Sequence, residues 1–119
     1  MESILLSIKK LLGIPRDYKH FDTDIIMHIN SVFMVLNQLG VGPVDGFVIT
    51  DEYVTWDEFI TDDDVLRENV KAYTGAKVRF QFDPPTSSAL LGALERMIAE
   101  YEWRINTAVS TSATEKTID

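Results

Sequence analysis

Residues 87–109, SSALLGALERMIAEYEWRINTAV, carry the clearest structural signal in this sequence. Hydrophobic residues recur there at helical spacing over about five turns, which predicts one long amphipathic helix. Thr86, Ser87 or Ser88 can cap its first turn, and Asp83-Pro84-Pro85 ends the element before it. The predicted core face of this helix consists of Leu90, Leu91, Leu94, Met97, Ile98, Tyr101, Ile105 and Ala108.

Three further helices are predicted upstream, at about 3–12, 22–39 and 62–82. Asp22 can accept the free N–H groups at the start of the second helix. For the end of the third helix, the alternation over 78–82 makes a strand the competing interpretation. Together with the helix at 87–109, these elements predict a mainly α fold, a small bundle of about four helices.

The segment 41–61 interrupts this helical pattern and is predicted to be a long acidic loop or a β-hairpin. In the hairpin, Phe47–Ile49 and Tyr53–Trp56 would be short strands. A connection of this length between helices is unusual unless it is functional, so a binding arm and a hairpin folded back on its own helices both remain open. Its aromatic residues are Phe47, Tyr53, Trp56 and Phe59.

Charge is distributed unevenly along the 119 residues, whose net charge is −8. Eight acids and no base lie between Val41 and Leu66, whereas the rest of the chain holds 11 of each. Such an acidic chain lacks the basic field on which nucleic-acid affinity depends, so a DNA- or RNA-binding module is excluded. The absence of cysteine excludes disulfide scaffolds and thiolate chemistry. No apolar run approaches the ~20 residues of a membrane span, and no membrane partner is predicted.

The search for catalytic chemistry finds little. His20, Asp22 and Asp24 form the single cluster that resembles a metal site, and a metal-dependent hydrolase built on them is the weakest hypothesis considered. The two acids serve a helix start equally well. No phosphate-binding glycine loop or nucleophile–base pattern is present. We therefore expect no catalytic residue, no metal and no cofactor.

Surplus hydrophobic residues point instead to assembly. Met27 and Met34 lie opposite the apolar face of the second helix, and Trp103, with Arg96 beside it, lies on the reverse side of the last one. Such side chains are expected to be buried by neighbouring copies or partners. The predicted subunit or partner interface consists of Met27, Met34, Phe47, Tyr53, Trp56, Phe59, Arg96 and Trp103.

The run from Lys77 to Asn106, KVRFQFDPPTSSALLGALERMIAEYEWRIN, resembles the small head-tail connector proteins of long-tailed bacteriophages, also called adaptor or head-completion proteins. DTDIIMHINSVFMVLNQLGVGP (Asp22–Pro43) and TWDEFI (Thr55–Ile60) fit the same family. The resemblance covers about residues 1–108, which we take as the helical connector domain, with 109–119 as a flexible C-terminal tail. One departure is Thr74-Gly75 inside a helix, where glycine costs ~1 kcal/mol relative to alanine.

The resemblance implies a non-enzymatic virion protein at the head-tail interface, assembled in the host cytoplasm. Copies of the family form a ring, of about twelve, below the portal protein. The ring extends the DNA channel without specific DNA binding and joins the capsid vertex to the head-closure (stopper) protein and tail. The family's C-terminal segment reaches the portal. Portal docking is thereby assigned to Val109, Ser110, Thr111, Lys116 and Ile118.

A different class of function fits the same charge pattern. An acidic inhibitor or DNA mimic would bind a basic host protein through residues 45–64, where the acids concentrate. Such a protein would remain small, and its binding would weaken with salt because exposed charges are screened.

Overall fold

The structure, a computed structural model, describes the backbone of residues 2–118 and the side chains of residues 2–111. Within those residues the chain is helical and contains no strand, so the predicted mainly α bundle is confirmed. The elements are α1 (Ile4–Leu11), α2 (Asp22–Gln38), α3 (Trp56–Phe59), α4 (Asp64–Phe82) and α5 (Ser88–Ile118).

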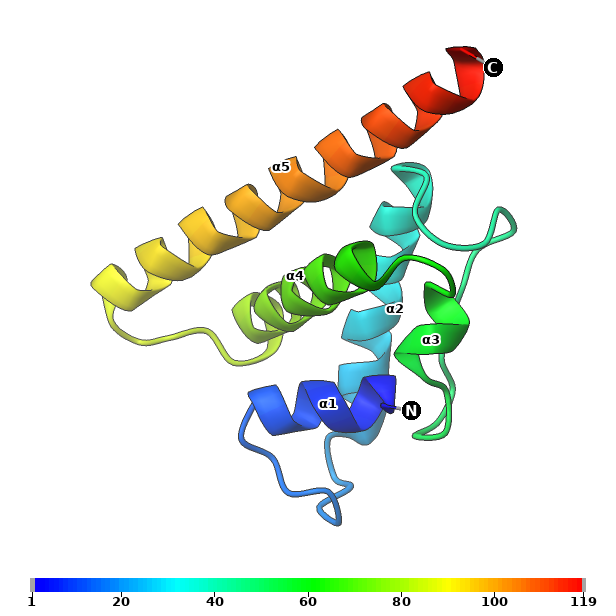
Figure 1. The fold of residues 1–119 in the computed structure, drawn as a ribbon. Helices are drawn as coiled ribbons and strands as arrows, with labels where there is room; N and C mark the ends of the chain where they lie inside the picture. The colour runs from blue at the N-terminus through cyan, green and yellow to red at the C-terminus, as the bar shows by residue number, and fades with distance from the viewer. Residues whose placement is uncertain (1, 119) are drawn as a thin grey trace.

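Helix α4 occupies the centre of the fold and contacts each of the other four helices. It runs antiparallel to α5, to which a short loop connects it, while α2 crosses behind and α1 lies below (Figure 1). One hydrophobic core lies between these layers and is formed by the inward faces of the helices. Its α1 and α2 members are Ile4, Leu5, Ile8, Ile25, Ile29, Val32, Phe33 and Leu36. Full burial of such a side chain contributes ~1.5–3 kcal/mol.

The helix at 64–82 is regular through Gly75 and up to Phe82, so the strand interpretation of 78–82 is wrong. Asp63 caps its start, since its Oδ1 accepts the Leu66 N–H at 3.0 Å. Packing explains why a glycine stands at position 75 of this helix, because a Cβ there would lie 2.5 Å from Leu11 Cδ1. Glycine therefore allows the end of α1 to approach α4 closely.

The start of α2 differs from the prediction. Phe21 is the N-cap residue and no side chain caps this helix. Asp22 Oδ1 instead lies 2.8 Å from the Nζ of Lys9, which is 1% exposed. The same ammonium donates to the carbonyl oxygens of Arg16 and Tyr18, at 3.0 and 2.8 Å. Two of the three ammonium donors are therefore hydrogen-bonded to carbonyls, and the Asp22 carboxylate balances the buried charge.

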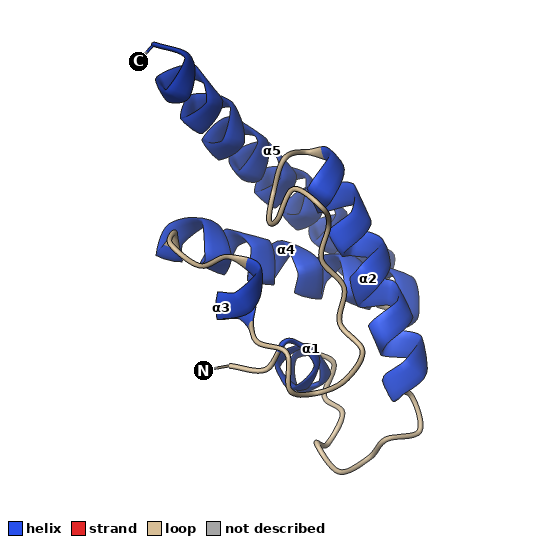
Figure 2. Ribbon diagram, turned by 90° about the vertical axis from the view of Figure 1, so that its right-hand side faces the viewer, coloured by secondary structure: helices blue, strands red, loops and turns tan. Residues whose placement is uncertain are grey.

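Helix α5 is longer than predicted. It continues as a helix to Ile118, past the end expected near 109, because extending an existing helix costs far less than nucleating one. The division into a connector domain at 1–108 and a flexible tail at 109–119 stays a prediction. Its 31 residues correspond to ~46 Å at the α-helical rise. The longest dimension of the molecule is 49 Å, and the C-terminal part of α5 projects beyond the body (Figures 1 and 2).

Candidate interaction surfaces

The segment 41–61 is an extended loop that ends in the short helix α3, so the hairpin prediction is wrong. Ser3 and Thr55 form an isolated antiparallel bridge between the loop and the start of the chain. The Ile4 N–H donates to the Val54 carbonyl at 3.0 Å, and the Trp56 N–H donates to the Glu2 carbonyl at 3.1 Å. The segment therefore pairs with the N-terminal residues and not with itself.

Three of its four aromatic residues pack back onto α2. Phe33 lies at the centre of this cluster, with ring centroids 6.1 Å from Phe47, 6.0 Å from Trp56 and 4.3 Å from Phe59. Trp56 and Phe59 are 1% and 4% exposed, and the Trp56 Nε1–H donates to Ser7 Oγ at 2.7 Å. The expectation that Trp56 and Phe59 face a neighbouring subunit is corrected accordingly, because the chain's own core covers both.

A glycine makes this packing possible. Gly42 has a φ of +84°, which a side chain disfavours. A Cβ at Gly42 would lie 2.3 Å from Cε1 of Phe59. The turn that begins the segment and the aromatic cluster that ends it are therefore in direct contact.

Most of the acids in the base-free segment have structural partners within the chain. Glu52 lies 3.7 Å from Arg16 and 3.8 Å from Lys19, while Asp57 and Asp64 lie 3.2 and 2.6 Å from Arg67. Three other acids of the segment accept hydrogen bonds from nearby backbone N–H groups, namely Asp51, Glu58 and Asp63. Much of the acidic surplus is thus neutralised or used locally.

The two remaining acids of the segment are Asp45 and Asp62. In the described part of the chain, neither has an ion pair within 4 Å. Both are exposed, so they are the acids of this segment that remain for a partner.

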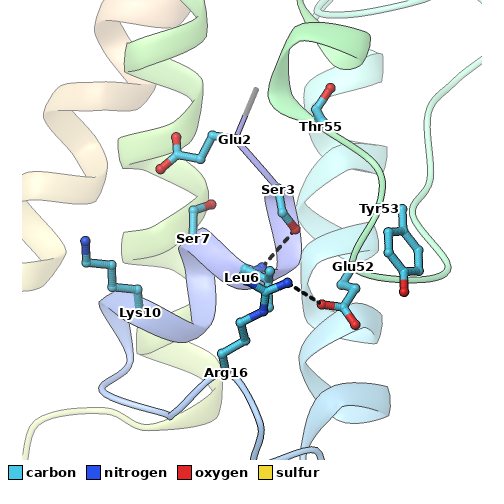
Figure 3. Close-up of a pocket in the computed structure, with 9 residues that line it drawn as sticks. All are labelled: Glu2, Ser3, Leu6, Ser7, Lys10, Arg16, Glu52, Tyr53 and Thr55. Carbon is cyan, nitrogen blue, oxygen red and sulfur yellow. Dashed lines mark hydrogen bonds and ion pairs between the residues drawn. The ribbon is translucent and has the colours of Figure 1, made fainter.

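A depression of about 430 Å³ lies where the N-terminal residues, α1 and the loop around Tyr53 meet (Figure 3). Arg16 and Glu52 point toward one another there, and Glu2 pairs with Lys71. The first pair holds the segment after α1 to the loop, and the second holds the N-terminal residues to α4. Tyr53 lies at the edge of this depression and is 78% exposed, so it remains accessible.

Three other predicted interface residues are exposed. Met27 and Met34 are 58% and 64% exposed on the outer face of α2, and Trp103 on α5 is 68% exposed. Arg96 is exposed on the same helix as Trp103. Phe47 is partly buried against Phe59, with stacked rings 4.9 Å apart.

Part of the predicted core face of α5 is also exposed. Leu94 and Ile105 are buried, as expected, but Leu90 and Met97 are 60% and 46% exposed. Met97 lies beside α4, but the α4 residues that face it include the small Ala72, Gly75 and Ala76, which leave a depression there. Helical periodicity identified the apolar face of α5 but carried no information about the size of the residues that face it.

Tyr73 connects α4 to the middle of α5. Its hydroxyl donates to Glu102 Oε2 at 3.3 Å. Burial, followed by the charge of Glu102 and the hydrogen bond to it, raises the pKa of Tyr73 to about 12. A neighbouring residue, Trp103, is meanwhile directed to solvent.

The predicted portal-docking residues begin where α5 leaves the body. Val109 is half-buried, and a Cβ on Gly40 would lie 3.3 Å from its Cγ1. Ser110 and Thr111 are exposed on the next turn. The side chains of Lys116 and Ile118 lie outside the described residues. Portal docking stays a prediction for all five residues.

The weak metal hypothesis finds no geometric support. His20 is exposed and packs edge-on against Phe21, with ring centroids 4.8 Å apart, while Asp22 pairs with Lys9. Among the described residues, no group of three or more His, Asp or Glu side chains is placed to hold a metal ion. Nor is any helix in that range long and apolar enough to cross a membrane.

Fold and surface together define a helical subunit whose exposed apolar residues suit contacts with other proteins. Comparison of the sequence with protein families gives a match over residues 4–112 to the family described as phage connector protein. No curated protein and no solved structure matches the chain. The chain belongs to the phage connector protein family, a structural component of the virion that connects head and tail.

Proposed function

We propose that this connector is the adaptor that forms a ring below the portal, extends the DNA channel and joins the capsid vertex to the head-closure protein and tail. The observation that carries the proposal is the family match, which spans nearly the whole chain, from residue 4 to residue 112. The chain acts by assembly, and no catalytic step is assigned to it.

Exposed apolar side chains support the proposed ring. Met27 and Met34 on α2 and Trp103 on α5 are each more than half exposed, and methionine and tryptophan are enriched at protein interfaces. Tyr53 and Arg96 extend the candidate contact surface. These residues belong to different helices and loops, so more than one surface of a subunit can contact its neighbours.

The projecting end of α5 supports the proposed portal contact. The C-terminal part of α5 projects beyond the body of the subunit, so a partner can reach it from several directions (Figure 2). In this proposal, Val109 ties the helix to the body and the residues up to Ile118 dock on the portal.

The DNA channel gives one of the remaining acids a role. Asp62, when it faces the lumen, repels phosphates and limits adhesion of DNA during its passage. Replacing Asp62 with lysine should slow packaging or ejection. Unchanged packaging and ejection for Asp62→Lys would remove this role.

Native mass measurement, with and without the purified portal protein of the same phage, tests the adaptor role. We expect a large multimer that contains the portal and many copies of this chain. Deletion of residues 110–119 should weaken portal binding while leaving the melting temperature of the free chain unchanged, because Val109 and the buried Ile105 are retained. A chain that stays small beside the portal and binds a basic protein in a salt-sensitive manner would instead be an acidic mimic.

A further inference from the structure

Two apolar surfaces on different layers of the molecule remain uncovered. The first, which we call the α4–α5 groove, is a depression of about 260 Å³ between α1, α4 and α5 that continues into a second one of about 200 Å³. Small residues, including Gly75, are part of its lining, and Leu94 and Met97 line both depressions. Leu11, Leu90 and Met97 flank it with 54%, 60% and 46% of their surface exposed.

The second surface, which we call the α2 outer face, lies on another layer. Met27 and Met34 project from α2, and Val48 of the following loop is 60% exposed beside Met34. Ser31, between the two methionines along the helix, bonds its hydroxyl to the Met27 carbonyl at 3.0 Å and adds little bulk. The α2 outer face is therefore a ridge of two flexible apolar side chains, a form that fits irregular grooves.

The two surfaces carry opposite charges. Arg79 is the one charged residue that lines the α4–α5 groove, and it lines both of its depressions. Asp45 is the one charged residue in the depression of about 400 Å³ that adjoins Met34 and Val48. Within the described residues, neither Arg79 nor Asp45 has an ion pair within 4 Å.

We propose that the α2 outer face of one copy packs into the α4–α5 groove of the next, with Asp45 of the first copy paired with Arg79 of the second. The proposal rests on the ring proposed above and names the surfaces that form it. Because the two surfaces belong to different elements, the contact is head-to-tail, the type that a closed ring requires. Each copy then offers one ridge and one groove, and no apolar surface of this pair remains uncovered.

Exchange of the two charges is the decisive experiment. Arg79→Asp and Asp45→Arg should each reduce the multimer fraction of the full-length chain about tenfold, because each places like charges in contact. The double variant restores opposite charges in reversed order and should recover most of the multimer. Asp62→Arg, which changes the same net charge at an acid outside the groove and the ridge, is the matched control and should assemble normally.

Cross-linking gives an independent readout, because the chain contains no native cysteine. Met34→Cys and Met97→Cys chains, treated with a short bismaleimide, should form a linked dimer only when the two are mixed. Val65→Cys, at a 73% exposed position outside both surfaces, is the control partner and should not link to Met97→Cys. Linking of Met97→Cys chains to each other would overturn the proposal in favour of a symmetric contact between two grooves.

The outcomes separate this inference from the adaptor role. Normal assembly with the portal by both single charge variants would overturn the pairing of these surfaces and leave the adaptor role standing. Failure of the unsubstituted chain to assemble, alone or with portal, would count against the adaptor role. In that case the cysteine pair decides the inference alone: linkage between Met34→Cys and Met97→Cys supports it, and no linkage overturns it.

Discussion

The two tryptophans of this chain occupy opposite environments. Trp56, in the loop region before α4, is 1% exposed and its indole N–H is bonded to Ser7. Trp103, on the outer side of α5, is 68% exposed. Both stand among acidic residues in the sequence, and both were candidates for a contact with another subunit. The difference shows that an aromatic residue in an acidic loop can serve the chain's own core, while one on a regular helix can remain available to a partner.

The cause of this difference is long-range packing. Trp56 reaches the core because the residues before it pair with the N-terminal residues, which draws the loop against α1 and α2. Trp103 lies on the side of α5 opposite Ile105, which is fully buried, so the same helix that anchors itself through one face presents the other to solvent.

The largest expected effect is at Trp56. Trp56→Ala should lower the free energy of unfolding by ~3–5 kcal/mol, because it removes a buried aromatic side chain and the hydrogen bond from its indole N–H to Ser7. Urea denaturation followed by circular dichroism measures it. A loss below ~1 kcal/mol would mean that the loop is not part of the core in solution.

The next effect concerns the turn that lets the loop fold back. Gly42→Ala should lower the free energy of unfolding by ~2–4 kcal/mol, because alanine is strained at a positive φ and its Cβ would clash with the buried Phe59 ring. Gly46→Ala is the matched control: its φ is +93°, but nothing lies within 4 Å of the added Cβ. Gly46→Ala should lower the free energy of unfolding by ~1 kcal/mol. Equal losses at both positions would show that Phe59 does not pack against Gly42.

A pH dependence tests how α5 is anchored beside Trp103. Because folding raises the pKa of Tyr73 to about 12 from its ordinary value near 10, the folded chain keeps a proton that the unfolded chain loses. The contribution of the protonated Tyr73 hydroxyl to folding stability is complete below pH 10 and is lost as the pH rises toward 12. Tyr73→Phe should therefore flatten the alkaline decline of the urea midpoint. Tyr53→Phe, at a 78% exposed position, controls for the loss of a phenol.

The smallest effect on stability is expected at Trp103. Trp103→Ala should change the free energy of unfolding by less than ~0.5 kcal/mol, because the side chain is mostly exposed. The same variant should reduce assembly with the portal in native mass measurements, since exposed tryptophans often anchor interfaces. A stability loss similar to that of Trp56→Ala would remove the contrast between the two residues.

Helix positions were predictable because helical periodicity and helix caps depend on residues that are close together in the sequence. Ser3 Oγ accepts the Leu6 N–H at 3.2 Å and caps α1, and Asp63 caps α4 in the same way, so both helix starts follow from residues three positions apart. Exposure of Met27, Met34 and Trp103 was also predictable, since each lies opposite a strong apolar face.

Other features depended on contacts that no local pattern contains. Lys9 lies within a helix and reads as a surface lysine, yet it is buried because loop carbonyls and Asp22 converge on its ammonium. Leu90 and Met97 follow the core periodicity of α5 but are exposed, because they border a groove that α4 leaves open.

By itself, the sequence determined that the chain is a mainly helical bundle, that its acids concentrate before α4, and that it belongs among phage connectors. Only the tertiary structure decided which apolar residues are covered: it folded Trp56 and Phe59 inward, left the α4–α5 groove and the α2 outer face open, and paired most of the acids with Arg16, Lys19 and Arg67 or with backbone N–H groups. Helix formation depends on the spacing of residues that are neighbours along the chain. The burial of a side chain depends on which distant segment packs against it, and that is determined only when the whole chain folds.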